Sequence, residues 1–82
     1  MDGLVKITKD CYVPRSQIKF FAVYNMNSIR SRVKAGKAKG TVLDLCGGKK
    51  ILTAVFLVTG EIILVNTAAE TISQRFEPKG GA

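Results

Sequence analysis

Two apolar runs in the second half of this chain constrain its fold more than any other feature. Residues 51–58, ILTAVFLV, and residues 61–65, EIILV, are separated only by Thr59 and Gly60. Branched and aromatic residues in runs of this length are typical of strands, and the break between them is typical of a tight turn. We therefore expect an antiparallel pair of strands joined by this turn.

These runs also predict how the sheet is covered. A strand with one solvated face alternates between apolar and polar residues, and neither run does so. Both faces of the sheet are therefore expected to be buried, either by the chain's own helices or by a second copy of the chain. Hydrophobic residues make up 46% of only 82 residues. Because a small domain has little interior, we favour burial against a second copy.

Further strand signals lie on both sides of a central helical segment. A third strand of the antiparallel meander is predicted at 41–45, and extended segments precede it at 4–7, 12–14 and 18–23. Pro14 confines the second of these segments to an edge or a bend. The sequence thus predicts a small antiparallel sheet in an α+β fold.

Capping signals place two helices. Ser28 is expected to cap a helix from about Ile29 to Ala38, and Gly40 suits the left-handed residue at its end. The segment TAAE at 67–70 predicts a capping box, which opens a short C-terminal helix that ends near Phe76. We therefore expect one domain over residues 1–77, with a central basic helix, and a flexible tail over 78–82.

Charge indicates the class of partner. Thirteen Lys and Arg against six Asp and Glu give a net charge of +7, which favours a polyanionic partner. No acidic residue lies between Cys11 and Leu43. Like charges repel at i,i+4 on a helix, and a phosphate backbone would relieve that repulsion as its counterions are displaced. The predicted helix carries its cations in two rows, Arg30, Lys34 and Lys37 in one, Arg32 and Lys39 in the other.

The stretch DLCGGKKI at 44–51 has three possible interpretations. A phosphate-binding loop of the Walker type needs a Ser or Thr after its lysine and a following helix, whereas Lys50 is followed by Ile51 and a strand. Gly47 and Gly48 suit a hairpin turn, because glycine adopts positive φ without strain. Lys49 and Lys50 would then project from the tip toward a phosphate, or serve only as solvated lysines that discourage edge aggregation.

Other chemistries find little support in the sequence. The chain has no histidine and only two cysteines, Cys11 and Cys46, so neither a metal site nor acid–base catalysis is expected. Cys46 is expected to be a small apolar side chain, and Asp44 to hydrogen-bond to the turn. No segment reaches the roughly 20 apolar residues of a membrane span, and no signal peptide is visible. We expect a cytoplasmic, non-enzymatic protein without cofactor or small-molecule substrate.

The order of these segments resembles the RemA-type family of bacterial extracellular-matrix (biofilm) regulators. That family shows a basic helix, a strand that leads into a Gly-Arg-Arg turn, two further strands and a PETIAQRF-like ending. The matching segments here are KG at 39–40, VLD at 42–44, GKK at 48–50, AV at 54–55, IL at 63–64 and ETISQRF at 70–76. The N-terminal third aligns more weakly.

The resemblance implies a DNA-binding transcription regulator that assembles into a closed ring. Its paired arginines are taken as DNA contacts, and Lys49 and Lys50 occupy those positions. A further basic residue of the family falls on or beside Gln17, with Arg15 and Lys19 nearest. Together with the helix cations, the expected set of contacts to duplex DNA is Lys49, Lys50, Arg15, Lys19, Arg30, Arg32 and Lys34.

Two other functions remain open. An RNA-binding oligomer would use the same basic surface but needs exposed aromatic rings on which bases stack. The clustered aromatics available for this are Tyr12, Phe20, Phe21 and Tyr24. A structural or interaction protein would carry its charge incidentally. We expect a nucleoid-associated regulator whose partners are duplex DNA and further copies of itself.

Overall fold

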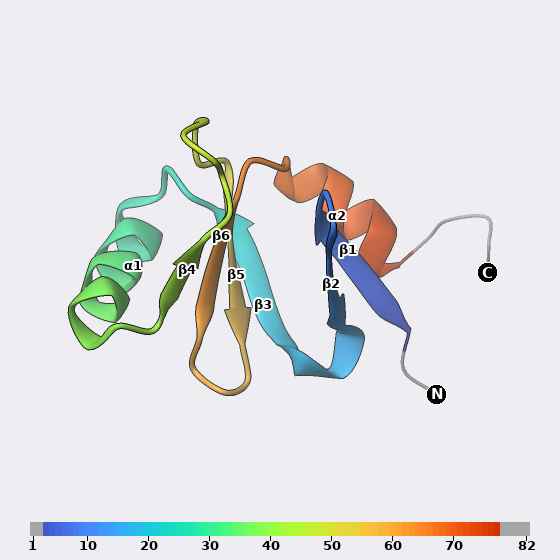
Figure 1. Ribbon diagram of the computed structural model, residues 1–82, viewed down its shortest axis with the longest axis horizontal. Coiled ribbons are helices and arrows are strands. Elements are labelled where there is room, and N and C mark those ends of the chain that lie inside the picture. The colour runs from blue at the N-terminus through green and yellow to red at the C-terminus, as the bar shows by residue number, and fades with distance from the viewer. Residues whose placement is uncertain (1–2, 78–82) are drawn as a thin grey trace.

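The structure, a computed structural model, describes residues 3–77, and these form an α+β fold of two small sheets and two α-helices (Figure 1). In chain order the elements are β1 (Leu4–Thr8), β2 (Cys11–Pro14), the 3₁₀ turn η1 (Arg15–Gln17), β3 (Ile18–Val23), α1 (Asn27–Lys39), β4 (Val42–Asp44), β5 (Thr53–Leu57), β6 (Ile62–Val65) and α2 (Ala69–Phe76). The predicted tail at 78–82 lies outside the described residues.

The central sheet has four strands in the order β3-β5-β6-β4. The predicted hairpin of β5 and β6 is confirmed, and Gly60 adopts a φ of 96° in the turn between them. The prediction that 41–45 completes an antiparallel meander is wrong, because β4 pairs parallel with β6, Leu43 opposite Ile63. This order places the fully buried β6 in the interior of the sheet, where strands on both sides satisfy its backbone.

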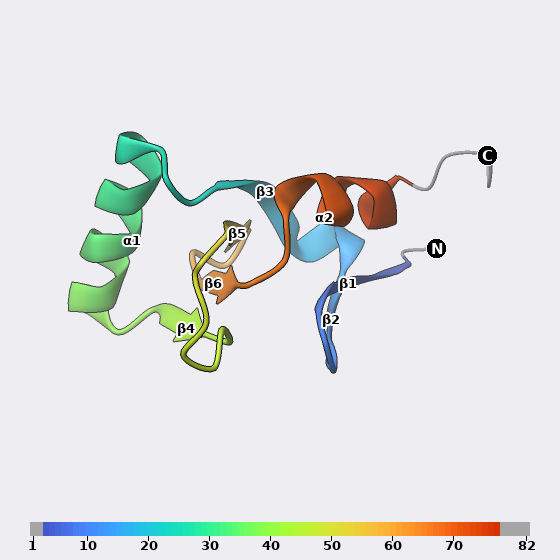
Figure 2. The same cartoon turned by 90° about the horizontal axis from the view of Figure 1, so that it is seen from above.

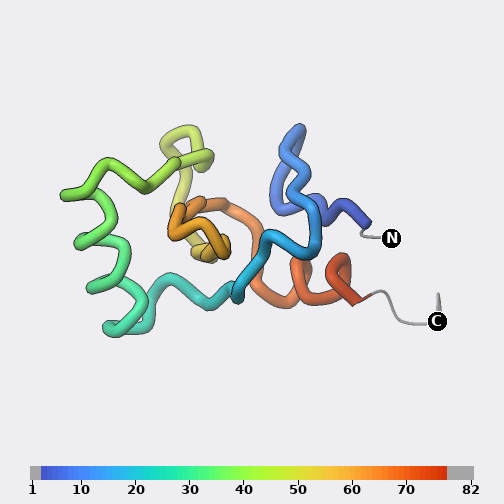
Figure 3. Tube along the Cα trace, turned by 90° about the horizontal axis from the view of Figure 1, so that it is seen from below, coloured from blue at the N-terminus to red at the C-terminus, as the bar shows by residue number. Residues whose placement is uncertain are grey.

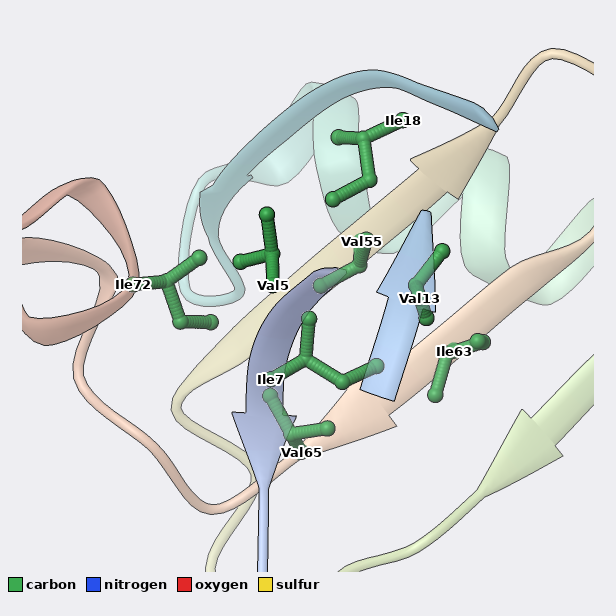
Figure 4. Packing of buried hydrophobic residues seen from close by; sticks show 8 residues of the cluster. All are labelled: Val5, Ile7, Val13, Ile18, Val55, Ile63, Val65 and Ile72. Atoms are coloured by element: carbon green, nitrogen blue, oxygen red, sulfur yellow. The ribbon is translucent and has the colours of Figure 1, made fainter. Parts of the chain in front are cut away.

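Both faces of this sheet are covered within one chain. Helix α1 lies against one face, and the β1–β2 hairpin together with α2 lies against the other (Figure 2). The hairpin and α2 bury the cluster drawn in Figure 4, which consists of Val5, Ile7, Val13, Ile18, Val55, Ile63, Val65 and Ile72. The cluster under α1 consists of Ile29, Val33, Cys46, Ala54, Phe56, Ile62 and Leu64. The apolar runs therefore need no second copy for burial, because the N-terminal hairpin supplies the missing cover.

Helix α1 approaches the sheet closely at a glycine. A Cβ at Gly36 would lie 2.9 Å from Cγ2 of Val42 and 3.0 Å from Cδ1 of Ile62, so this helix position has no room for a side chain. Gly40 ends the helix with a φ of 76°, as predicted. The expected cap at Ser28 is wrong: the helix begins at Asn27, and no side chain caps its first amides.

Helix α2 is held by contacts to the rest of the fold rather than by a capping box. No side chain caps its N-terminus, and the backbone carbonyl of Thr67 accepts a hydrogen bond from Oγ1 of Thr53 (2.6 Å). Near its other end, Nη1 of Arg75 donates to the carbonyl of Lys6 in β1 (2.9 Å). These bonds tie α2 to both sheets, so its position does not depend on a local N-terminal signal.

Candidate nucleic-acid interface

The glycine pair of the central loop forms a tight turn. The backbone N–H of Lys49 donates to the carbonyl of Cys46 (3.1 Å), and Gly47 and Gly48 between them have φ values of 61° and 86°. Positive φ at both central residues is the signature of a type I′ turn, which glycine adopts without strain. Asp44 accepts a hydrogen bond from the N–H of Cys46 (2.8 Å), which confirms its expected bond to the turn.

This turn does not join neighbouring strands, and the prediction of a β-hairpin is wrong. The loop at 45–52 carries the chain from β4 past β6 to β5, because β6 lies between the two. Backbone bonds anchor it on both sides, from Leu45 N–H to the carbonyl of Leu64 (2.9 Å) and from Leu52 N–H to that of Val65 (3.0 Å). Nδ2 of Asn66 also donates to the carbonyl of Lys50. Lys49 and Lys50 are exposed on this tethered loop.

Cys46 belongs to the core rather than to a reactive site. Its side chain is 5% exposed and packs in the cluster beneath α1. Burial, followed by the hydrogen bond and negative charge of Asp44, raises the pKa of the thiol to about 11. The thiolate is the reactive form of cysteine, so this environment suppresses its reactivity. The expected role as a small apolar side chain is confirmed.

The strand directions define two ends of the sheet. Strands β3, β4 and β6 all finish at one end, which we name the loop end because the loop at 45–52 lies there. The N–H of Tyr24, just after β3, donates to the carbonyl of Leu52 in that loop (3.0 Å). The opposite end, which we name the turn end, holds the start of β3 and the β5–β6 turn (Figure 1).

Helix α1 carries one row of cations on each of its two flanks. It crosses the sheet obliquely, from the side of β3 at the loop end to the side of β4 at the turn end (Figure 1, Figure 3). One groove along it, the loop-end groove, contains Tyr24 together with Arg30, Lys34 and Lys37. A second, the turn-end groove, contains Arg32 and Lys39 of α1 together with Lys19 of β3. The two rows seen in the sequence thus lie on opposite flanks of the helix.

The remaining predicted contact lies apart from both grooves. The guanidinium of Arg15 in η1 stacks over the ring of Phe76 in α2, 5.3 Å from its centroid. This places Arg15 with the elements that cover the sheet face opposite α1. The structure therefore does not assemble the seven predicted residues into one patch. It places Lys49, Lys50, Arg30 and Lys34 at the loop end, Lys19 and Arg32 at the turn end, and Arg15 against α2.

The predicted set of contacts omitted two cations that line these grooves. Lys37 joins Arg30 and Lys34 in the loop-end groove, and Lys39 joins Arg32 in the turn-end groove. Their spacing of seven residues from Arg30 and Arg32 is the signal in the sequence that links them to these rows. None of the residues lining either groove, all within 3–77, is acidic.

Neither a metal-binding cluster nor a membrane-spanning helix is found among the described residues. Across residues 3–77, no three His, Cys, Asp or Glu side chains gather where they could hold a metal ion. No helix in the same range is long and apolar enough to cross a membrane. The two grooves and the loop at 45–52 share exposed cations as their common chemistry.

Comparison with known proteins identifies the family. No curated protein gives a significant match to the chain. A sequence model of the RemA-like family, described as extracellular matrix regulatory protein A-like, matches residues 4–76. This match begins in β1 and ends at the last residue of α2, so it includes every element of the fold. The resemblance seen in the sequence is confirmed, and the chain belongs to the RemA-like family.

Proposed function

We propose that this protein is a DNA-binding transcription regulator of the biofilm-matrix type, acting in the cytoplasm on the nucleoid as a homo-oligomer. The observation that carries this proposal is the loop end. Two exposed lysines on the tethered loop at 45–52 lie at the same end of the sheet as Tyr24, which lines a groove with three cations and no acidic residue. Arrays of this kind attract the phosphate backbone, and its released counterions favour binding.

The turn at 46–49 suits a contact with a rigid partner. Its backbone is fixed by bonds to Cys46 and to β6, so binding orders only the lysine side chains. Immobilising fewer groups lowers the entropic cost of association. Lysine contacts a phosphate as a point charge, without the two parallel hydrogen bonds that arginine makes. We therefore expect the loop lysines to contact the phosphate backbone of DNA, and such contacts carry little sequence preference.

Assembly into a ring would multiply these weak contacts. The resemblance to ring-forming regulators supports it, as do exposed apolar side chains that neither cover of the sheet buries. Leu4 and Tyr12 on the β1–β2 hairpin are 66% and 56% exposed, and Leu43 on the edge strand β4 is 53% exposed. Several copies that contact one duplex would gain affinity by avidity, without any new type of contact.

A salt titration of duplex DNA tests the proposal. For the wild type we expect affinity to fall steeply with salt. For Lys49→Ala/Lys50→Ala the slope of log K against log salt should flatten by about 0.9 for each phosphate that the variant no longer neutralises. Lys49→Arg/Lys50→Arg keeps the charge and should tighten binding about threefold, because each guanidinium can bond two phosphate oxygens.

Arg15→Ala serves as the comparison, since it removes a cation that stacks on Phe76 away from the loop. Its affinity and slope should stay near those of the wild type. An unchanged slope in the double alanine variant would contradict the loop contact. Light scattering at micromolar concentration should give a mass above that of a dimer, and a monomer would contradict the ring.

RNA binding is the weaker alternative. Phe20 stacks on Phe56 beneath α1 (4.4 Å between centroids), whereas Phe21 packs near Phe76 on the opposite face (6.0 Å). Rings on opposite faces do not offer one platform for consecutive bases. The same titration with single-stranded RNA should therefore give weaker binding than duplex DNA, and the reverse order would favour the RNA-binding function.

A further inference from the structure

The turn-end groove is a second cationic surface that the proposed function does not use. We propose that it binds the phosphate backbone of a second DNA segment, so that the protein bridges two duplexes. This inference rests on the proposed function, because it takes the loop end as the primary DNA contact. It is carried by the separation of the two grooves and by the construction of the second one.

Three cations from separate places in the chain meet in this groove. Lys19 comes from β3, Arg32 from the first half of α1 and Lys39 from its last turn, and all three side chains are exposed. Between them lie apolar side chains, including the half-buried Phe20 and the buried Phe56. No carboxylate lines the groove, and its cations lie over a low-dielectric base, where attraction to a phosphate is stronger than in bulk water.

The depth of the groove depends on Gly36. Its missing side chain allows α1 to approach within van der Waals contact of Val42 and Ile62. Arg32 and Lys39, on the flank beside that glycine, therefore lie close to the sheet and share a groove with Lys19. Packing against the sheet alone requires none of these three charges, because all three side chains lie outside the buried clusters.

The dimensions favour a backbone over an enclosed small molecule. The groove has a volume of about 240 Å³ and is open to solvent. Pockets that bury a small ligand typically reach roughly 300–1,000 Å³ and enclose most of its surface. A shallow groove with cations along its edges instead matches a phosphate backbone, of which only one side is contacted.

The two surfaces cannot share one straight stretch of duplex on a single protomer. They lie at opposite ends of the sheet, on opposite flanks of α1. The two grooves face away from each other across α1, and a six-residue strand such as β3 spans roughly 20 Å, so a single duplex would have to bend around the protomer to enter both. Duplex DNA has a persistence length of about 150 base pairs and resists such a bend strongly. Separate segments are therefore the expected partners.

A bead assay measures bridging directly. A biotinylated duplex on streptavidin beads captures the full-length protein, and recovery of a second, fluorescent duplex reports bridging. The test variant is Lys19→Ala/Arg32→Ala/Lys39→Ala, and the matched control is Arg30→Ala/Lys34→Ala/Lys37→Ala, which removes the same charge from the loop-end groove. Circular dichroism confirms that each variant is folded, and Lys19→Arg/Lys39→Arg should retain bridging.

The turn-end variant should bind a single duplex within about threefold of the wild type but recover the second duplex about tenfold less, because it lacks three cations that neutralise phosphates. The loop-end variant should lose affinity already for the first duplex. Undiminished bridging by the turn-end variant would overturn the inference, since repeated loops in the oligomer would then account for it. The inference would also be overturned if the turn-end variant lost as much affinity for the first duplex as Lys49→Ala/Lys50→Ala does, because both ends would then act as one DNA-binding surface.

Competition distinguishes a backbone phosphate from a free one. Millimolar inorganic phosphate or a nucleoside triphosphate should not displace the second duplex at constant ionic strength. Displacement at micromolar nucleotide would overturn the backbone assignment in favour of a small-ligand site. If the wild type binds no single duplex, the proposed function itself fails, and that outcome differs from a loss of bridging alone.

Discussion

The two faces of the central sheet are buried equally well, yet the elements that cover them differ in charge. Helix α1 carries five cations and no acidic residue, whereas α2 carries Glu70 and Arg75. Arg75 is also used within the fold, since it donates to the carbonyl of Lys6. Comparable burial is thus achieved with and without a strongly cationic cover. The charge on α1 is therefore not a requirement of packing and is available to a partner.

The covers also differ in how they meet the sheet. The α1 side relies on the bare backbone of Gly36 for a close approach to the neighbouring strands. On the other side, α2 inserts the fully buried Ile72, and the hairpin adds Val5 and Ile7. Adding a side chain at Gly36 should therefore overpack the α1 side, whereas truncating a buried side chain should leave a cavity on either face.

The largest expected effect tests whether both faces are true cores. Leu64 lies under α1 and Ile7 belongs to the hairpin, and both side chains have 0% exposure. Replacing either one by alanine should lower the free energy of unfolding by about 2–5 kcal/mol. Urea denaturation measures both. Ile7→Val, expected to cost about 0.5–1.5 kcal/mol, gives a readable value if the alanine variant does not fold. A cost for Ile7→Ala near zero would show that the hairpin is not an essential cover.

Local signals in the sequence predicted the elements well. The strand at Ile18–Val23 has the predicted bounds, and Gly40 ends α1 in the expected left-handed conformation. The buried residues of α1 are Ile29, Val33 and Gly36, whose spacing of four and three residues is that of one helix face. Such features depend on neighbouring residues and on backbone sterics, and both can be read from a short segment.

Features that depend on distant segments were not predictable in the same way. The parallel pairing of β4 with β6 is decided by which strand occupies the interior of the sheet, and spacing along the chain does not encode this. The cover supplied by the β1–β2 hairpin joins residues about 50 positions apart, such as Val5 and Val55. In the candidate site, the spacing of the cations along α1 was enough to predict that they form two separate rows. Which end each row faces depends on how α1 crosses the sheet.

A smaller change in the free energy of unfolding is expected for Gly36→Ala, and its sign should be opposite to the one that helix propensity alone predicts. Alanine is favoured over glycine in a helix by about 1 kcal/mol, but here its Cβ would overpack against Val42, which typically costs about 1–3 kcal/mol. Gly36→Ala should therefore destabilise the protein by about 1 kcal/mol, measured by urea denaturation. Ala38→Gly on the exposed side of α1 calibrates the propensity term. A stabilising Gly36→Ala would refute the close approach.

The smallest effect compares one arginine from each cover. Arg75→Met keeps the apolar stem but removes the hydrogen bond to Lys6, so it should cost about 1 kcal/mol of stability, while DNA affinity stays unchanged. Arg32→Met on the exposed flank of α1 should change stability by less than about 0.5 kcal/mol. Thermal unfolding and the bridging assay on the same samples separate the two roles. If Arg32→Met destabilised as much as Arg75→Met and left bridging intact, the charge of α1 would be structural, and the contrast between the two faces would disappear.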